Sequence, residues 1–236
     1  MNKELSIIIP AYNEEERIEE TVESAVAYFR AKKYKFEVLL VNDGSTDATL
    51  ERSRDLERRL SEVHVVDLGQ NLGKGQAVKE GIAHAHFAYC LFMDADNATA
   101  VTEWDKFEPF FEAGSRAVVA SRRLPASRIV HKQPLVRRAL GGGYRNLCRG
   151  LFGLAASDLN CGFKAYETAL AKKVYKDVQL LGWAFDTEVF CLLKKEGVLV
   201  EEVPVVWEHR EKKTNLAPFK AGFETLGSLL RLKKKY

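Results

Sequence analysis

Residues 91–99, "LFMDADNAT", place two aspartates one residue apart directly after an apolar run. Two carboxylates this close raise each other's pKa, and burying either of them costs several kcal/mol unless a cation accompanies it. Asp94 and Asp96 therefore indicate either a divalent metal site at the end of a buried strand or a solvated turn, where aspartates are also common. The ends of the other predicted strands bear on this choice.

Short β-branched runs alternate with helical patterns through the first half of the chain. In the first helical pattern, apolar residues recur at helical spacing and glutamates crowd the first turn, where the helix dipole favours them. This alternation predicts an α/β fold with a doubly wound, mostly parallel sheet flanked by helices. The predicted strands are 5–9, 36–41, 63–68, 88–93 and 117–121, and the predicted helices are 14–30, 47–60 and 75–85.

Each of the first four predicted strands ends in polar or glycine-rich sequence. In a doubly wound sheet, ligands bind beyond the carboxyl ends of the strands. Together these ends predict a ligand site; the alternative is a set of ordinary polar turns, with Ser45 or Asp47 capping a helix. The four stretches are "PAYNEEE" (10–16), "VNDGSTD" (41–47), "LGQNLGKG" (68–75) and "MDADNAT" (93–99).

The composition is typical of a soluble globular protein. Of the 236 residues, 46% are apolar and 29% charged; the net charge of +3 does not point to nucleic acid, and we predict no such partner. The amino terminus runs directly into the apolar stretch "LSIIIP", so we expect no signal peptide, and no apolar run reaches the ~18 residues of a membrane-spanning helix. The four cysteines are far apart, which predicts free thiols in a reducing compartment: Cys90, Cys148, Cys161 and Cys191.

Residues 113–157 contain nine lysines and arginines but no aspartate or glutamate. A positive tract of this kind favours phosphate or an anionic membrane surface. Within the tract, apolar and basic residues recur on two different helical faces, which predicts an amphipathic helix that lies on a membrane or, alternatively, packs on the domain. The apolar face carries Leu140, Tyr144, Leu147 and Leu151, and the basic face carries Arg138, Arg145 and Arg149.

The order and spacing of "IIIPAYNEE", "VNDGSTD", "NLGKG" and "MDAD" resemble the family 2 glycosyltransferases of the GT-A fold. The later stretches "ASRR", "DLNCGFKAY", "GWAFDTE" and "VPVVW" look more specifically like dolichyl-phosphate glucosyltransferases, and more distantly like dolichyl-phosphate mannose synthases. The resemblance covers nearly the whole chain. It implies a metal-dependent hexosyltransferase that moves glucose from UDP-glucose to dolichyl or another polyprenyl phosphate with inversion, giving a β-linked product.

Two alternatives remain within this resemblance. One is transfer of mannose from GDP-mannose, and the other is a family 2 transferase acting on a hydroxyl acceptor. Mannose synthases carry Gln where this chain has Ala98, whereas glucosyltransferases carry Gly where it has Asn97, so the motif is closer to the glucosyltransferase form. This favours UDP-glucose as the donor.

The resemblance also implies roles for individual residues. Asp94 and Asp96 would hold Mg²⁺ or Mn²⁺. The remaining positions that match the family's nucleotide-sugar site are Pro10, Ala11, Tyr12, Glu14, Asp43, Lys74 and Ala95. The alternative for Lys74 is a solvated lysine at a helix start.

The acceptor phosphate is expected to meet basic residues. Arg122 and Arg137 match the family's positions for it, with Lys164 and Lys213, of the pair 212–213, as further candidates. Asp186 would orient sugar hydroxyls, or serve as the base if the acceptor were a hydroxyl; its alternative role is in the first turn of a helix. Asp96, Arg122, Arg137 and Asp186 are therefore the predicted catalytic residues.

We predict a single domain over residues 1–236, in which 1–121 bind the nucleotide sugar and 122–236 face the acceptor and the membrane surface. We expect the protein to be peripheral on the cytoplasmic face of a membrane. Eukaryotic relatives have an amino-terminal anchor that this sequence does not show, so contact is expected from the basic helix and the tail "GSLLRLKKKY" (227–236). The sequence does not predict the oligomeric state.

Overall fold

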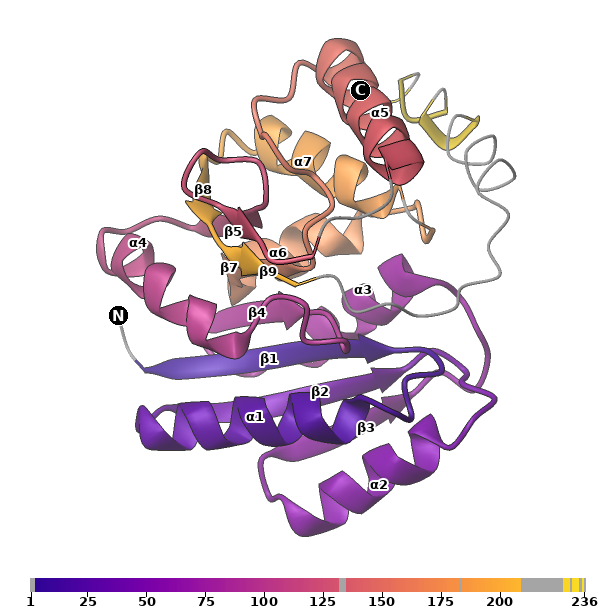
Figure 1. Cartoon of the computed structure of the whole chain (residues 1–236), viewed down its shortest axis with the longest axis vertical. Coiled ribbons are helices and arrows are strands. Elements are labelled where there is room, and N and C mark those ends of the chain that lie inside the picture. Colours follow the sequence, from indigo (N-terminus) through magenta and orange to yellow (C-terminus); the bar gives the residue numbers. More distant parts are fainter. Residues whose placement is uncertain are drawn as a thin grey trace.

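One mixed sheet of seven strands organises the computed structural model, which describes residues 3–131, 135–182, 184–208, 227–229, 231–233 and 235, with backbone alone for 135–137 (Figure 1). The strand order is β3-β2-β1-β4-β7-β5-β8, and β6 and β9 form a small second sheet. The strands are β1 Glu4–Ala11, β2 Lys35–Asn42, β3 Val63–Asp67, β4 Tyr89–Met93, β5 Ala117–Ser121, β6 Arg128–Ile129, β7 Phe163–Glu167, β8 Val200–Pro204 and β9 Val206–Trp207. The helices are α1 Ile18–Ala31, α2 Thr49–Arg59, α3 Lys74–His84, the 3₁₀ helix η1 Val101–Lys106, α4 Glu108–Glu112, α5 Leu135–Phe152, α6 Thr168–Lys176 and α7 Phe185–Lys195.

The doubly wound, mostly parallel sheet predicted from the sequence is confirmed. The five predicted strands correspond to β1 to β5, and the three predicted helices to α1, α2 and α3. In the large sheet, β7 is antiparallel to both of its neighbours, β4 and β5, and the other pairings are parallel.

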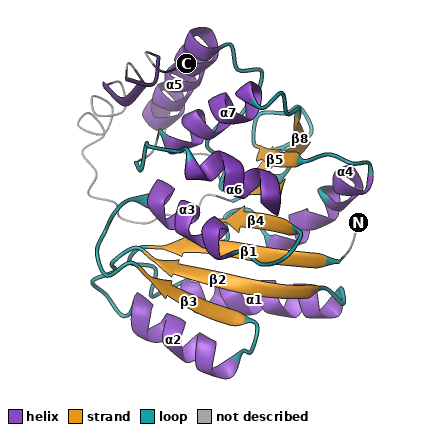
Figure 2. Ribbon diagram, turned by 180° about the vertical axis from the view of Figure 1, so that it is seen from behind, coloured by secondary structure: helices purple, strands orange, loops and turns teal. Residues whose placement is uncertain are grey.

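Helices cover both faces of the sheet. Side chains alternate along a strand, so Leu5, Ile7 and Ile9 of β1 pack with α1, whereas Ile8 packs with α3 on the opposite face. Figures 1 and 2 show the two layers, with α1 and α2 on one side and α3 and α6 on the other. Burying each of these isoleucines contributes about 1.5–3 kcal/mol, which is how the apolar strands dictate the layered arrangement.

The second half of the chain returns to the middle of the sheet. β7 pairs with β4, so that Phe163 lies opposite Met93 and Lys164 lies opposite Phe92. The two halves predicted from the sequence therefore share one sheet. Residues just before β7 are brought beside the end of β4, where the two aspartates begin.

The predicted amphipathic helix corresponds to α5, but its apolar face is divided. Cys148 and Phe152 are buried in a cluster with α7, whereas Leu140 and Leu147 are 53% and 40% exposed. Tyr144 donates or accepts a hydrogen bond with Thr187 Oγ1 at 2.7 Å. One face of α5 thus packs on the domain, and the Leu140–Leu147 line faces outward.

Two leucines of the carboxyl-terminal segment, which was expected to contact a membrane, are buried in the domain. Leu229 and Leu232 are 1% and 3% exposed and belong to the same apolar cluster as Phe152. Lys233 Nζ donates to the carbonyl oxygen of Leu151 at 2.6 Å. These leucines are used to cover the domain, so they do not present an apolar surface to lipid.

Glu188 anchors this part of the fold. Its carboxylate is fully buried, accepts hydrogen bonds from the N–H groups of Gln179 and Leu180 at 2.8 Å each, and pairs with Lys235 Nζ at 2.9 Å. It therefore ties α7, the loop before it and the carboxyl-terminal segment together.

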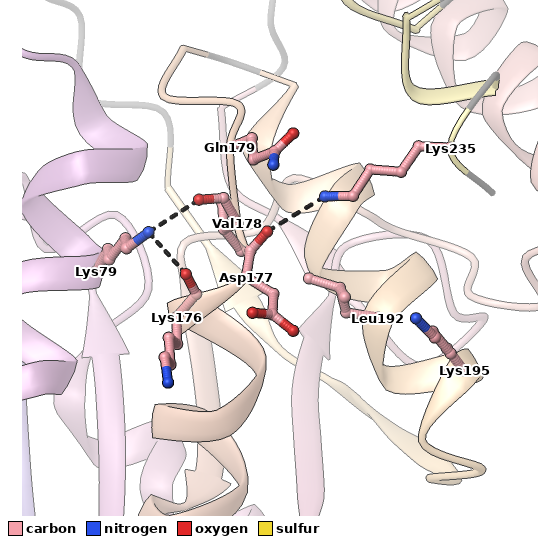
Figure 3. A pocket seen from close by; sticks show the side chains of 8 residues that line it. All are labelled: Lys79, Lys176, Asp177, Val178, Gln179, Leu192, Lys195 and Lys235. Carbon is pink, nitrogen blue, oxygen red and sulfur yellow. Dashed lines mark hydrogen bonds between the residues drawn. The ribbon is translucent and has the colours of Figure 1, made fainter.

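A cavity of about 300 Å³ lies beside this anchor and is lined by four lysines (Figure 3). Lys79 Nζ donates to the carbonyl oxygens of Lys176 and Val178 at 3.0 Å each, and Lys235 Nζ donates to that of Asp177 at 3.3 Å. Two of the four ammonium groups thus cap the carboxyl end of α6, where the helix dipole is negative. This capping explains why Lys79 and Lys235 point into the cavity.

Two further sequence predictions can be compared with the structure. All four cysteines are buried free thiols, as predicted. Within the described part of the chain, no helix is both long and apolar enough to cross a membrane.

Replacing Glu188 with Ala should lower the free energy of unfolding by about 2–4 kcal/mol, because two partly buried N–H groups and the ammonium group of Lys235 lose their acceptor. Equilibrium unfolding in urea measures this loss. Glu112→Ala, on the exposed surface of α4, is the matched control and should change stability by less than about 0.5 kcal/mol. Equal urea midpoints for Glu188→Ala and the unsubstituted protein would contradict the anchoring role.

Candidate active site

Three neighbouring parallel strands deliver their carboxyl ends to one edge of the sheet. β1, β2 and β4 pair in register, so the loops after Ala11, Asn42 and Met93 emerge side by side. The first two loops are joined by Asn13, whose N–H donates to Ser45 Oγ at 3.0 Å and whose Oδ1 accepts from the Thr46 N–H at 2.8 Å. The clustering of strand ends that the sequence predicted is therefore present.

The two aspartates that follow β4 are both half-buried at this edge. Asp94 Oδ1 accepts a hydrogen bond from Lys74 Nζ at 2.6 Å, and Asp96 Oδ1 accepts one from the Ala98 N–H at 3.0 Å. Burial raises the pKa of Asp96, and the charge of Asp94 raises it further, against the opposing effects of the Ala98 N–H and Lys74. The pair is therefore a site where negative charge exceeds positive charge.

Gly162, just before β7, makes room for Asp94. A Cβ atom at residue 162 would lie 2.0 Å from Asp94 Oδ2, closer than any side chain tolerates. The Asp94 N–H also donates to the Gly162 carbonyl oxygen at 3.0 Å. The stretch "CGFK" is thus more than a turn, because its glycine holds the space that the carboxylate occupies.

Lys74 is the first residue of α3, and the loop before it is fixed by Asp43. The carboxylate of Asp43 accepts hydrogen bonds from the N–H groups of Leu72 and Gly73 at 2.7 and 3.0 Å. Gly73 has φ 97° and a Cβ there would lie 2.6 Å from the Leu181 carbonyl oxygen, so only glycine fits. Asp43, predicted to be part of the nucleotide-sugar site, positions the loop that presents Lys74.

The remaining predicted donor-site residues surround this edge. Pro10 and Ala11 end β1 and are buried, Tyr12 is 44% exposed, and Ala95 is buried with its carbonyl oxygen bonded to Thr21 Oγ1 at 2.8 Å. Glu14 pairs with Arg17 at 3.3 Å, and its charge contributes to raising the pKa of Asp96. Tyr12 is therefore the exposed aromatic surface of the first loop.

A buried ion pair lies behind the aspartates. Lys164 Nζ pairs with Asp186 and donates to the Leu159 carbonyl oxygen at 2.8 Å, while the Lys164 side chain is fully buried. Lys164 was predicted to help hold an acceptor phosphate; the structure corrects this, because a side chain with no exposed surface and an ionic partner serves as a counter-ion. Burial raises the pKa of Asp186, and the charges of Lys164 and Lys74 oppose this shift.

Arg122, at the end of β5, is also paired. Its Nε and Nη2 donate to Asp158 at 2.7 and 2.9 Å, and its guanidinium lies 5.3 Å from the centre of the Trp207 ring. Burial alone would raise the pKa of the Asp158 carboxyl, but the hydrogen bonds and charge of Arg122 lower it to about 2. Within the described residues, Arg122 Nη1 has no hydrogen bond to the protein.

The fold gathers further arginines beside this pair. Partial burial lowers the pKa of Arg123, and the like charges of Arg122, Arg145 and Arg138 lower it further against the opposing charge of Asp158. Residues from the end of β5 and from α5 are thus close enough to repel one another. The sequence indicated the basic tract but did not single out Arg123.

Two predicted acceptor residues cannot be placed. Arg137 is in α5, but its side chain lies outside the described part of the structure, and Lys213 lies outside the described residues altogether.

Comparison with known proteins agrees with this arrangement. A model of the family described as "Glycosyl transferase family 2" matches residues 6–178. The chain belongs to this family.

Relatives of this family 2 chain include the "Dolichyl-phosphate beta-glucosyltransferase" of Dictyostelium discoideum, which is 30% identical over 98% of this chain and 74% of the relative. The chain spans about two thirds to three quarters of the length of the curated relatives that it matches first. The mannosyl-3-phosphoglycerate synthase of Rubrobacter xylanophilus has a TM-score of 0.72 at 18% identity, over 98% of this chain and 75% of that structure. The glucosyl-3-phosphoglycerate synthase of Mycobacterium tuberculosis, in complex with Mn²⁺ and UDP-glucose, has a TM-score of 0.69 at 17% identity, over 96% and 78%. These structures confirm the predicted GT-A fold.

The residues of this family 2 site fit a divalent cation that is shared with a phosphate ligand. Carboxylate oxygens are the donors that Mg²⁺ and Mn²⁺ prefer. Within the described residues, no group of three or more His, Cys, Asp and Glu side chains could hold a metal alone. A cation on Asp94 and Asp96 would complete its coordination with phosphate oxygens and water, as Mg²⁺ commonly does.

Replacing Gly162 with Ala should push the Asp94 carboxylate out of place, because the added methyl group would overlap its oxygens. We expect UDP-glucose binding in the presence of Mn²⁺ to weaken by at least about tenfold, since a misplaced charge-assisted contact costs about 1.5–3 kcal/mol. Calorimetry measures the affinity. Gly150→Ala, on the exposed surface of α5 where a Cβ meets nothing within 4 Å, is a control for glycine replacement and should leave binding unchanged. Unchanged binding in Gly162→Ala would show that the close packing on Asp94 does not matter.

The Arg122–Asp158 pair should make stability depend on pH. Because the folded-state pKa of Asp158 is lowered to about 2, the pair's stabilisation is present above about pH 4 and is lost as the pH falls toward 2. Asp158→Asn should therefore cost about 2–3 kcal/mol at neutral pH, and the gap to the unsubstituted protein should narrow between about pH 4 and 2. Urea unfolding across this range measures the gap. A gap that does not change with pH would refute the assignment.

Proposed function

We propose that the protein transfers glucose from UDP-glucose to dolichyl or another polyprenyl phosphate, with inversion to a β-linked product. The observation that carries the proposal is the meeting, at one sheet edge, of a carboxylate pair with a cluster of arginines. Carboxylates suit a metal-bound diphosphate donor, and arginines suit an anionic acceptor. A relative named dolichyl-phosphate beta-glucosyltransferase is 30% identical over 98% of this chain, and this similarity supports the choice of sugar and lipid.

The donor half of the proposed site is residues 1–121. Tyr12 offers an exposed ring to the base, and Lys74 and the amino terminus of α3 offer positive charge to the diphosphate. Bound on Asp94 and Asp96, Mg²⁺ or Mn²⁺ would supply Lewis acidity to the departing UDP. The aspartates hold the cation, and Lys74 balances the charge of the phosphates.

The acceptor half is residues 122–236. Arg122 and Arg123, with Arg138 and Arg145 nearby, form a cluster whose mutual repulsion a phosphate would relieve. In the transfer, an oxygen of the acceptor phosphate forms the new bond to the anomeric carbon while the bond to the UDP oxygen breaks on the opposite face. Since that oxygen is already anionic, no protein carboxylate has to remove a proton.

The state of Asp186 supports a phosphate acceptor over a hydroxyl acceptor. A hydroxyl would need a base, and Asp186 is the residue expected to provide it. This carboxylate is only 5% exposed and is paired with the buried Lys164. Its proposed role is to fix Lys164 and the wall of the site.

The outward line of Leu140 and Leu147 on α5 gives the protein a place to meet a membrane. Both leucines are exposed, and Arg138 and Arg149, also exposed, lie on the same helix. Lipid chains would favour the leucines, and anionic headgroups would favour the arginines. We therefore propose that the protein binds a membrane surface as a peripheral protein, and the cytoplasmic face stays a prediction from the sequence.

The assay that tests this function combines the protein with Mn²⁺, UDP-glucose or GDP-mannose, and a polyprenyl phosphate. Glucose should appear on the lipid, with little transfer of mannose. Arg123→Gln should raise the KM for the lipid phosphate about tenfold or more, because one charge-assisted contact is lost, while leaving UDP-glucose affinity unchanged.

The control for this variant is Arg116→Gln, which removes a charge from the same tract at an exposed residue that pairs with Glu167. It should behave like the unsubstituted protein. Transfer of mannose in preference to glucose would show that the donor is GDP-mannose and not UDP-glucose. A normal lipid KM in Arg123→Gln would exclude the arginine cluster as the acceptor site.

A further inference from the structure

Lys74 occupies a position that disfavours its charge. It is the first residue of α3, which has no acidic residue in its first turn. The positive end of the helix dipole repels a cation there. The ammonium group nevertheless lies 2.6 Å from Asp94 Oδ1 and 5.2 Å from the centre of the Phe92 ring. The carboxylate of Asp94 therefore offsets the repulsion between the Lys74 ammonium group and the helix dipole.

The backbone around Lys74 is held on both sides. Asp43 binds the two preceding N–H groups, and the Gly75 N–H donates to the Leu181 carbonyl oxygen at 2.8 Å. A Cβ at Gly75 would lie 2.8 Å from the Phe185 Cβ, so the start of α3 is closely packed. A change of partner at Lys74 therefore involves its side chain, which is about one third exposed, and not its backbone.

One of the two aspartates already has a cation beside it. Lys74 Nζ pairs with Asp94 at 2.6 Å, and Lys164 pairs with Asp186. Among the described residues, Asp96 forms no ion pair, although the charge of Asp94 acts on it. A divalent cation shared by the two aspartates would therefore have to replace Lys74 at Asp94.

We propose that Lys74 is a placeholder for the divalent cation. In the protein without donor it neutralises Asp94; when the metal and the sugar nucleotide bind together, Lys74 leaves Asp94 and turns to the diphosphate. The proposal rests on the proposed function, because it requires a metal and a nucleotide at this edge. It adds a coupling between the binding of the metal and the binding of the nucleotide.

The consequence is a coupling between the two ligands. A metal that binds alone has to separate Lys74 from Asp94 and leaves the ammonium beside a second cation. A metal that binds with a diphosphate gives Lys74 a new partner. Each ligand should therefore strengthen the other, and by linkage the factor is the same in both directions.

The test is Mn²⁺ binding, measured by the electron paramagnetic resonance signal of free Mn²⁺, with and without UDP. Without UDP, Lys74→Met should bind Mn²⁺ about tenfold more tightly than the unsubstituted protein, because no ammonium competes for Asp94. The gain in Mn²⁺ affinity on adding UDP should be smaller in Lys74→Met. Lys74→Arg keeps the charge and should keep weak metal binding. Lys172→Met, which removes a charge from the exposed side of α6, is the matched control and should bind like the unsubstituted protein.

The outcomes separate the two proposals. If the unsubstituted protein binds Mn²⁺ together with UDP but Lys74→Met shows the same or weaker Mn²⁺ affinity without UDP, the placeholder is refuted and the proposed function stands. If the unsubstituted protein binds neither UDP-glucose nor Mn²⁺, the proposed function fails, and the placeholder with it. Circular dichroism confirms that each variant is folded, and Lys74→Gln replaces Lys74→Met if the latter is not.

Discussion

The carboxylate of Asp94 occupies the space that a side chain at residue 162 would take, and the rest of the site depends on that packing. Two segments far apart in sequence have to meet for it to occur: the end of β4 and the start of β7. Antiparallel pairing of β7 with β4 brings them together and also aligns Lys164 with Phe92. The donor-side aspartate and the buried lysine of the second half are consequently fixed by the same strand pair, so neither half of the chain builds the site alone.

Burial of charge then dictates which residues can be neighbours. A carboxylate in a low-dielectric interior needs a cation or several hydrogen-bond donors, and here each one receives them from a different element. Asp186 of α7 is paired with Lys164 of β7, Asp158 with Arg122 at the end of β5, and Glu188 is bonded to the N–H groups of the loop before α7. Each of these carboxylates already has its partners within the protein. Asp94 and Asp96 differ because, among the described residues, a single ammonium group, that of Lys74, is bonded to one of them, and this leaves charge for a ligand to neutralise.

The sequence predicted the parts of the fold and site that depend on local pattern. Apolar runs predicted β1 to β5, and helical spacing predicted α1 to α3 and α5. Each of these patterns is contained within the element that it predicts. It could not predict partners set by long-range pairing. Lys164 was predicted to help hold the acceptor phosphate, because its counter-ion Asp186 is 22 residues away in the sequence. Asp158, the partner of Arg122, lies just beyond the acid-free tract, so the sequence did not indicate this pair. Nor did the sequence indicate that Leu229 and Leu232 are buried with Phe152.

The pairing of Arg122 changes how an acceptor phosphate would be held. Two nitrogens of the Arg122 guanidinium are bonded to Asp158, and its plane lies near the Trp207 ring, so the group cannot move toward a ligand. Because it is already oriented, it loses little conformational entropy when a ligand binds. Arg123 has the opposite character: its neighbours are cations, so it gains most from an incoming anion. Arg122 is rigid, and Arg123 beside it is repelled by neighbouring arginines. Together they suit the proposed acceptor phosphate, which must be held in line with the anomeric carbon. Because Asp186 is already committed to Lys164, the charge that drives the attack has to arrive on the acceptor itself.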